Sequence, residues 1–166
     1  MSFTNAVAEI ESKLVNPRDG LPDDVFQFIS RLTPLVNVDL LIKDKHNRTL
    51  LAWRDDQYAG KGWHIPGGIV RYKESLEHRV QQVAKNEIGQ TVHFNALPIA
   101  FNTMISSHET RGHFVSLLYE CSITSSFQPN NIDLTASDSG YLLWHDSCPS
   151  NLVKSHEMYR DYITKN

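Results

Sequence analysis

Apolar residues recur every three or four positions in four segments, which is the spacing of one face of an α-helix. The pattern predicts helices over residues 4–15, 22–32, 75–88 and 151–164. Gly89 directly follows the third of these and is the expected C-cap, because glycine readily adopts the left-handed conformation that ends many helices. The chain is therefore expected to begin with two short helices, before its first strand.

Elsewhere the apolar period switches to two or the apolar runs become short, and both patterns predict β-strands. The expected strands cover residues 36–43, 49–54, 97–105, 114–123 and 141–145. In the first of these the polar residues occupy the alternate positions, so one of its faces is expected to be polar.

Three connecting segments are predicted to be irregular. Residues 58–68 contain four glycines, a proline and a tryptophan and are expected to form a structured loop. Residues 108–112 are the expected tip of a hairpin, and residues 124–140 form a long polar loop, where functional groups often lie. The order of these elements predicts an α+β fold, with a mixed β-sheet covered by helices on both faces.

Composition narrows the possible functions. The 166 residues, 40% hydrophobic, suffice for one packed domain, and 16 basic against 19 acidic side chains give a net charge of −3. No general binding of nucleic acid is expected without a basic face, so an anionic ligand requires a local positive site. No apolar run is long enough to span a membrane. The N-terminus carries Glu9 and Glu11 and lacks the basic region of a signal peptide, and Cys121 and Cys148 are expected to be free thiols in a reducing cytoplasm.

The segment richest in chemistry begins at the glycines near residue 60 and ends at Gly89. Its Pro-Gly-Gly turn at residues 66–68 exposes backbone carbonyls and lets a ligand approach closely, because glycine has no Cβ. Glu74 lies near the start of the following helix and Glu87 near its end. Carboxylate and carbonyl oxygens are the ligands that Mg²⁺ takes in proteins, often together with phosphate groups.

This arrangement resembles the signature of the Nudix hydrolases. Gly68, Glu74, Glu87 and Gly89 have the spacing of the Nudix box, and the preceding Gly-x-Trp-x-x-Pro-Gly-Gly is also typical of the family. The box is degenerate, because four of its positions carry other residues, namely Gln82, Val83, Asn86 and Gln90.

The resemblance implies a Nudix-like α/β/α sandwich with a central mixed β-sheet. It divides the single domain, residues 1–166, into a helical extension over 1–33, a Nudix core over 34–145 and a C-terminal helix over 146–166. The N-terminal helix lies outside this core and could serve a homodimer.

One branch of the family, the GDP-mannose mannosyl hydrolases, has a similarly shortened box. Residues 33–39 and 50–54 resemble the first two strands of that branch. Its members bind one Mg²⁺ ion and displace GDP from the sugar carbon. The resemblance therefore implies an enzyme that hydrolyses a nucleoside diphosphate sugar with Mg²⁺ or Mn²⁺.

Metal ligands follow from the same resemblance. It implies that the Gly67 backbone carbonyl and the Glu87 carboxylate are ligands of the metal ion, and the spacing of the box makes Glu74 a third candidate ligand. An acid at the end of a helix opposes the helix dipole, so a compensating cation is expected beside Glu87. Glu74 has the alternative of a purely structural role, because the dipole favours an acid in the first turn.

Substrate contacts are implied for four residues. Arg54 matches the arginine that steadies the departing diphosphate, and Asp39 matches an aspartate at the sugar end of the pocket. Arg71 is a substitute for an arginine that the branch carries where this chain has Ile69. Trp63 is expected in the core or in the wall of the substrate pocket. Asp39 has the alternative of simply facing water from the polar side of its strand.

The general base is not assigned by the resemblance, because the branch has a Gln-His pair where this chain has Ser137 and Asp138. Asp138 is one candidate, since a carboxylate can act as a base, and His108 at the hairpin tip is another. Three functions therefore stay open: a hydrolase of nucleotide sugars, a Nudix-fold binding module without activity, and a hydrolase of phosphoanhydrides that uses Glu74 and Glu87.

Overall fold

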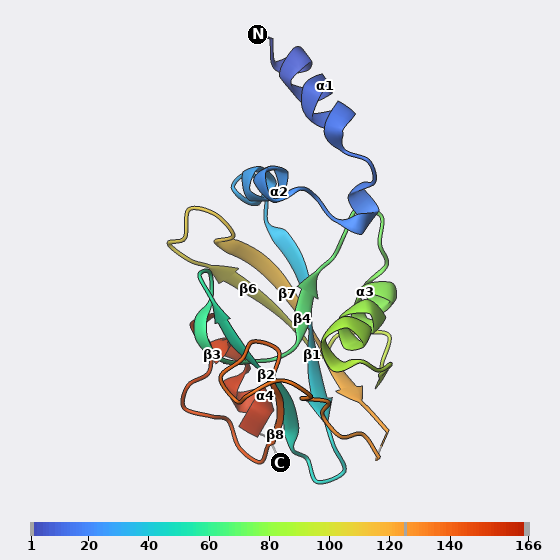
Figure 1. Ribbon diagram of the computed structural model, residues 1–166, viewed down its shortest axis with the longest axis vertical. Helices are drawn as coiled ribbons and strands as arrows, with labels where there is room; N and C mark the ends of the chain where they lie inside the picture. The colour runs from blue at the N-terminus through green and yellow to red at the C-terminus, as the bar shows by residue number, and fades with distance from the viewer. Residues whose placement is uncertain (1, 125, 165–166) are drawn as a thin grey trace.

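The computed structural model describes residues 2–124 and 126–164 (Figure 1). Its strands are β1 (Leu35–Lys43), β2 (Thr49–Asp56), β3 (Gly60–His64), β4 (Gly67–Ile69), β5 (His93–Phe94), β6 (Ala100–Ile105), β7 (His113–Ser122) and β8 (Leu142–His145). Its helices are α1 (Phe3–Lys13), η1 (Pro17–Asp19), α2 (Asp23–Ser30), α3 (Leu76–Val83), the π-helical turn η2 (Ala84–Ile88), η3 (Lys154–Tyr159) and α4 (Arg160–Thr164). Within the described ranges, no helix is both long and apolar enough to cross a membrane.

All eight strands belong to one mixed sheet with β1 near its centre. β1 runs parallel to β7 and antiparallel to β2 and β4. The remaining strands pair antiparallel at the sides, β3 and β8 with β2, and β5 and β6 with β7. β7 pairs with β1 along the whole length of β1, and the side chains of both strands alternate between the two faces of the sheet.

Successive residues of β1 point into two separate cores. Leu40 packs with Val80 and Val83 of α3 on one face, whereas Leu41 packs with Tyr159 and residues of α4 on the other. Helices therefore cover both faces of the sheet (Figure 1). This confirms the α+β sandwich that the sequence predicts.

The loop predicted over residues 58–68 is wrong, because this segment contains the whole of β3 and the first two residues of β4. Because these two strands are rich in glycine, their sequences show no alternation of apolar and polar residues. Pairing of β3 with β2 and of β4 with β1 determines their extended conformation instead. Gly62 shows why glycine is needed here: a Cβ at this position would lie 2.5 Å from the backbone oxygen of Asn151. The close approach brings the C-terminal segment onto β3.

Two predicted helices differ from the structure in their details. The helix over 75–88 ends in the π-helical turn η2, and Gly89 follows with φ 81°, which confirms the predicted C-cap. The expected helix over 151–164 begins only at Lys154, because Leu152 forms a bridge with Trp63 of β3. Tertiary pairing thus shortens that helix.

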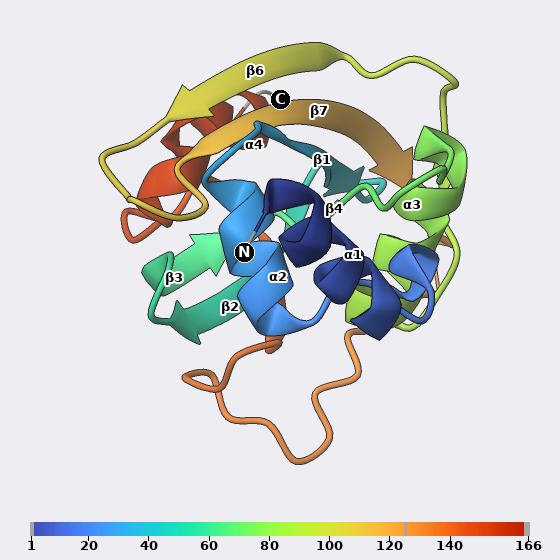
Figure 2. The same ribbon diagram turned by 90° about the horizontal axis from the view of Figure 1, so that it is seen from above.

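The N-terminal helices have different relations to the sheet. α1 buries none of its residues and stands away from the sheet (Figure 1), so the homodimer expected from its apolar face stays a prediction. α2 instead crosses the end of the sheet between β7 and the hairpin of β2 and β3 (Figure 2). Gln27 of α2 bonds to Tyr58 in that hairpin, which fixes the position of α2.

Candidate functional site

A cavity of ≈ 710 Å³ lies among the sheet, the hairpin that joins β6 to β7 and the C-terminal segment. Strands β1, β2 and β4 contribute to it, together with the hairpin between β6 and β7 and the segment η3. Its basic and imidazole side chains come from four separate parts of the chain, namely Arg54, His64, His108, Arg111, Lys154 and His156. This is the local positive site that an anionic ligand requires in a chain of net negative charge.

Asp39 lies in the wall of this cavity and is only 1% exposed. The Tyr159 hydroxyl donates a hydrogen bond to its Oδ2 at 2.6 Å, and the Asn37 side-chain amide donates to its Oδ1 at 2.6 Å. Burial raises the pKa of Asp39 to about 7, and the negative charge of Glu87 adds to this rise. Simple exposure of Asp39 to water, the alternative interpretation of its strand, is therefore wrong.

Gly67 lies directly opposite Asp39 in the pairing of β1 with β4. A Cβ on Gly67 would lie 2.2 Å from Oδ1 of Asp39, so only glycine allows this approach. The backbone of the Pro-Gly-Gly turn and a buried carboxylate thus share one small volume at the wall of the cavity.

Glu87 lies in the π-helical turn η2 and does not line the cavity, although its neighbour His64 does. The Nε2 atom of His64 lies 3.8 Å from Oε2 of Glu87, and about a third of the Glu87 side chain is exposed. Because the charge of Glu87 also raises the pKa of Asp39, the two carboxylates lie within electrostatic range of one another. A divalent cation would relieve this repulsion, and hard oxygen donors suit Mg²⁺ or Mn²⁺. In residues 2–124 and 126–164, no three His, Cys, Asp or Glu side chains form a metal-binding group, so substrate oxygens and water would complete the coordination.

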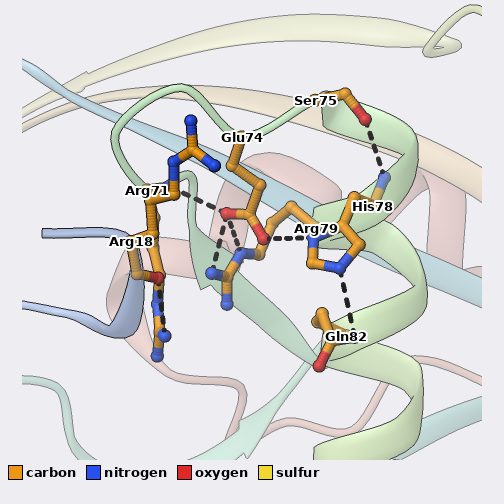
Figure 3. A network of polar contacts seen from close by, with 7 residues as sticks. All are labelled: Arg18, Arg71, Glu74, Ser75, His78, Arg79 and Gln82. Carbon is orange, nitrogen blue, oxygen red and sulfur yellow. Dashed lines mark hydrogen bonds and ion pairs between the residues drawn. The ribbon is translucent and has the colours of Figure 1, made fainter. Parts of the chain in front are cut away.

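Glu74 has a different environment from Glu87 (Figure 3). The guanidinium of Arg79 donates to its Oε2 through Nε and lies within 2.7 Å through Nη2. The backbone N–H of Arg71 donates to the same oxygen at 2.9 Å, and His78 contacts the other oxygen at 2.8 Å. Burial raises the pKa of Glu74, but these hydrogen bonds outweigh it and hold the pKa below its usual value. The structure thus does not bring Glu74 to the cavity.

Three further predicted residues also lie outside the cavity lining. Arg71 donates from Nη1 to the backbone oxygen of Arg18 at 3.1 Å (Figure 3). Trp63 is buried in the second core, where its ring meets those of Trp53 and His145.

Asp138 lies in the polar loop before β8 and also does not line the cavity. Its Oδ2 accepts hydrogen bonds from the backbone N–H and the hydroxyl of Thr135, both at 2.7 Å. These bonds lower the pKa of Asp138. The carboxylate thus closes a local turn.

Arg54 and His108 do line the cavity, as the sequence suggests for a binding residue and a base. Arg54 pairs with Asp56 through Nε and Oδ2 at 2.5 Å, which orients its guanidinium. His108 comes from the tip of the hairpin between β6 and β7.

His156 is a site residue that the sequence analysis missed. Its Nδ1 accepts the backbone N–H of Ile65 at 3.1 Å, so in the neutral ring the proton lies on the other nitrogen. Burial lowers the pKa of His156 well below its usual value, and the nearby His64 and Arg54 lower it further. A neutral imidazole with its acceptor nitrogen occupied can donate a hydrogen bond but cannot act as a base. No spacing motif marks this residue, because its partner Ile65 is 91 positions away.

Comparison with solved structures identifies the fold. The chain is similar to a MutT NUDIX hydrolase from Burkholderia pseudomallei, with a TM-score of 0.65 and 22% identity over 80% of this chain and 99% of that one. It is also similar to a NUDIX-family hydrolase from Clostridium perfringens, with a TM-score of 0.56, 17% identity and coverage of 79% and 96%. The chain is also similar to the NUDIX domain of Shewanella oneidensis NrtR, which was solved with ADP ribose. That match has a TM-score of 0.50 and 18% identity, and it covers 87% of this chain and 83% of that one. The chain therefore has the Nudix fold, as predicted.

Sequence comparison also finds similarity to curated proteins. The Low-salt glycan biosynthesis protein Agl8 of Haloferax volcanii is 27% identical over 121 residues, which cover 70% of this chain and 77% of that protein. No protein-family model matches the chain.

Proposed function

We propose that the chain is a hydrolase of a nucleoside diphosphate sugar such as GDP-mannose, dependent on Mg²⁺ or Mn²⁺. The observation that carries this proposal is the cavity that Asp39, Gly67 and Arg54 all line, with Glu87 within electrostatic range of Asp39. The similarity to a protein named for glycan biosynthesis and to a domain solved with ADP ribose supports a nucleotide-derived sugar as the substrate.

Gly67 and Glu87 are the residues that would hold the metal ion, and Glu74 is left out because both of its oxygens already have close partners. When bound, the ion neutralises negative charge on the leaving diphosphate. Arg54 stabilises the same charge, since a guanidinium matches phosphate oxygens in geometry and sign. Asp39, held by Tyr159, faces the sugar and orients its hydroxyl groups.

The bond that breaks is the one between the anomeric carbon and the diphosphate oxygen. Water attacks that carbon, GDP leaves with the electron pair of the bond, and the proton of the water passes to a general base. We assign this role to the His108 imidazole, because it lines the cavity and Asp138 does not. A box with few carboxylates suits this route, because displacement at carbon needs no metal cluster to activate water for attack at phosphorus.

Hydrolysis of GDP-mannose in ¹⁸O-labelled water tests the proposal. We expect unlabelled GDP and a labelled free sugar of inverted anomeric configuration. Mass spectrometry locates the label, and NMR gives the anomeric configuration. Label in a phosphate, with GMP and a sugar 1-phosphate as products, would contradict it and favour a hydrolase of phosphoanhydrides. Tight binding of nucleotide sugars without products under either metal would instead identify a binding module.

A further inference from the structure

Arg111 lies at the tip of the hairpin between β6 and β7 and lines the same cavity. Its backbone adopts the left-handed conformation, with φ 57°. Its N–H donates to the hydroxyl of Ser30 in α2 at 3.3 Å. The hairpin tip is thus tied to the N-terminal helical extension, so the side chain starts from a defined position at the rim.

Two aromatic rings hold the guanidinium of Arg111. Its central carbon lies 4.5 Å from the ring centre of Tyr58 and 5.6 Å from that of Phe26 in α2. The Tyr58 hydroxyl accepts a hydrogen bond from Gln27, also in α2, at 2.8 Å. Contact with ring faces fixes the plane of a guanidinium and leaves the N–H groups at its edge for hydrogen bonds.

Hydrogen-bond partners distinguish Arg111 from Arg54, the other guanidinium of the cavity. Arg54 is paired with Asp56, whereas the buried Nε of Arg111 has no hydrogen-bond partner within residues 2–124 and 126–164. Burial lowers the pKa of Arg111 and the positive charge of Arg54 lowers it further, whereas the negative charges of Asp56 and Asp23 partly offset this effect. Arg111 and Arg54 therefore lie within electrostatic range of one another. A buried N–H without a partner and two neighbouring positive charges are both costly unless an anion meets them.

We infer that Arg111 is an anion-binding residue that holds, together with Arg54, the diphosphate group of the substrate. This inference rests on the proposed function and assigns a further residue to it. A diphosphate offers several negatively charged oxygens along its length, so it can meet two guanidiniums from different elements at once.

The inference also gives α2 a role. Residues 1–33 are expected from the sequence to lie outside the Nudix core, yet Phe26, Gln27 and Ser30 of α2 hold Tyr58 and Arg111 in place. α2 is therefore a positioning element of the binding site.

Calorimetric titration of the full chain with GDP, and with ADP in parallel, tests this inference in the presence of Mg²⁺. We expect Arg111→Met to weaken binding of the nucleoside diphosphate by about 10-fold or more, the usual size for a lost charged hydrogen bond. Arg31→Met is the matched control, because Arg31 is an exposed arginine at the end of α2 and does not line the cavity. We expect it to bind as the wild type does.

Salt dependence separates a direct contact from a merely structural role. Affinity for GDP is expected to fall less steeply with added NaCl in Arg111→Met than in the wild type, and Arg111→Lys is expected to restore the steep dependence with intermediate affinity. If Arg111→Met does not fold, Arg111→Lys against Arg31→Lys gives the same comparison. Equal affinities of the Arg111 and Arg31 variants would overturn the inference alone. A wild-type chain that binds neither GDP nor ADP would overturn the proposed function and the inference with it.

Discussion

Glu74 and Glu87 lie at the two ends of one helical segment, and their carboxylates have opposite surroundings. Glu74 is buried and contacts Arg79, His78 and a backbone N–H, so its charge is fully compensated (Figure 3). Among the residues that the structure describes, Glu87 has one ion-pair partner, His64 at 3.8 Å, and its charge raises the pKa of the buried Asp39. The spacing of the Nudix box predicts a site role for both.

The difference shows that the partners of a carboxylate decide its role. The positive partner of Glu74 comes from Arg79, one turn before Gln82, the position where the box has its arginine. Gln82 itself contacts His78 rather than Glu74, with 3.4 Å between its Nε2 and the Nε2 of His78. Glu74 therefore forms a structural ion pair, whereas the carboxylate of Glu87 can still bind a cation.

The largest expected effect is the loss of the Arg79 guanidinium. Arg79→Met leaves the buried carboxylate of Glu74 without its main partner, and breaking such a pair costs about 3–5 kcal/mol of unfolding free energy. Urea denaturation measures this loss. Lys13→Met is the control, because it breaks the exposed pair with Glu9 and should cost less than about 1 kcal/mol. Equal losses in both variants would show that the Glu74 pair is not structural.

A smaller effect is expected in the pH dependence of stability. Because the pKa of Glu74 is lower in the folded chain than its usual value, the ion pair stabilises the fold above about pH 5 and loses this effect as the pH falls through the folded pKa. The stability gap between the wild type and Glu74→Gln should therefore be largest near neutral pH and close in acid. A gap that stays constant from pH 7 to pH 3 would contradict the assignment.

The sequence predicts the fold because its information is local. The helical spacing of α3 correctly predicts which of its residues enter the core. The polar face predicted for β1 is wrong, because Asp39 and Leu41 on that face are buried against the second core. Gly67 and Arg54 could be proposed as site residues because they lie in motifs with fixed spacing. Their roles stay predictions, although both residues line the cavity.

Long-range contacts explain what the sequence could not predict. Tyr159 reaches Asp39 across 120 positions, and this contact turns an apparently exposed strand residue into a buried one. The role proposed for Arg111 depends on Phe26 of α2 and on Tyr58, whose rings lie against its guanidinium. No local pattern in the chain contains these pairings.

Titration of Mn²⁺, followed by electron paramagnetic resonance of the free ion, tests most directly whether Glu87 holds the metal and Glu74 does not. Glu87→Gln should weaken Mn²⁺ binding by about 10-fold or more, and without metal it should be as stable as the wild type or slightly more so, because it removes a negative charge from a helix end. Glu74→Gln, checked for folding by circular dichroism, should bind Mn²⁺ as the wild type does. Unchanged affinity in Glu87→Gln, or a loss confined to Glu74→Gln, would contradict the account.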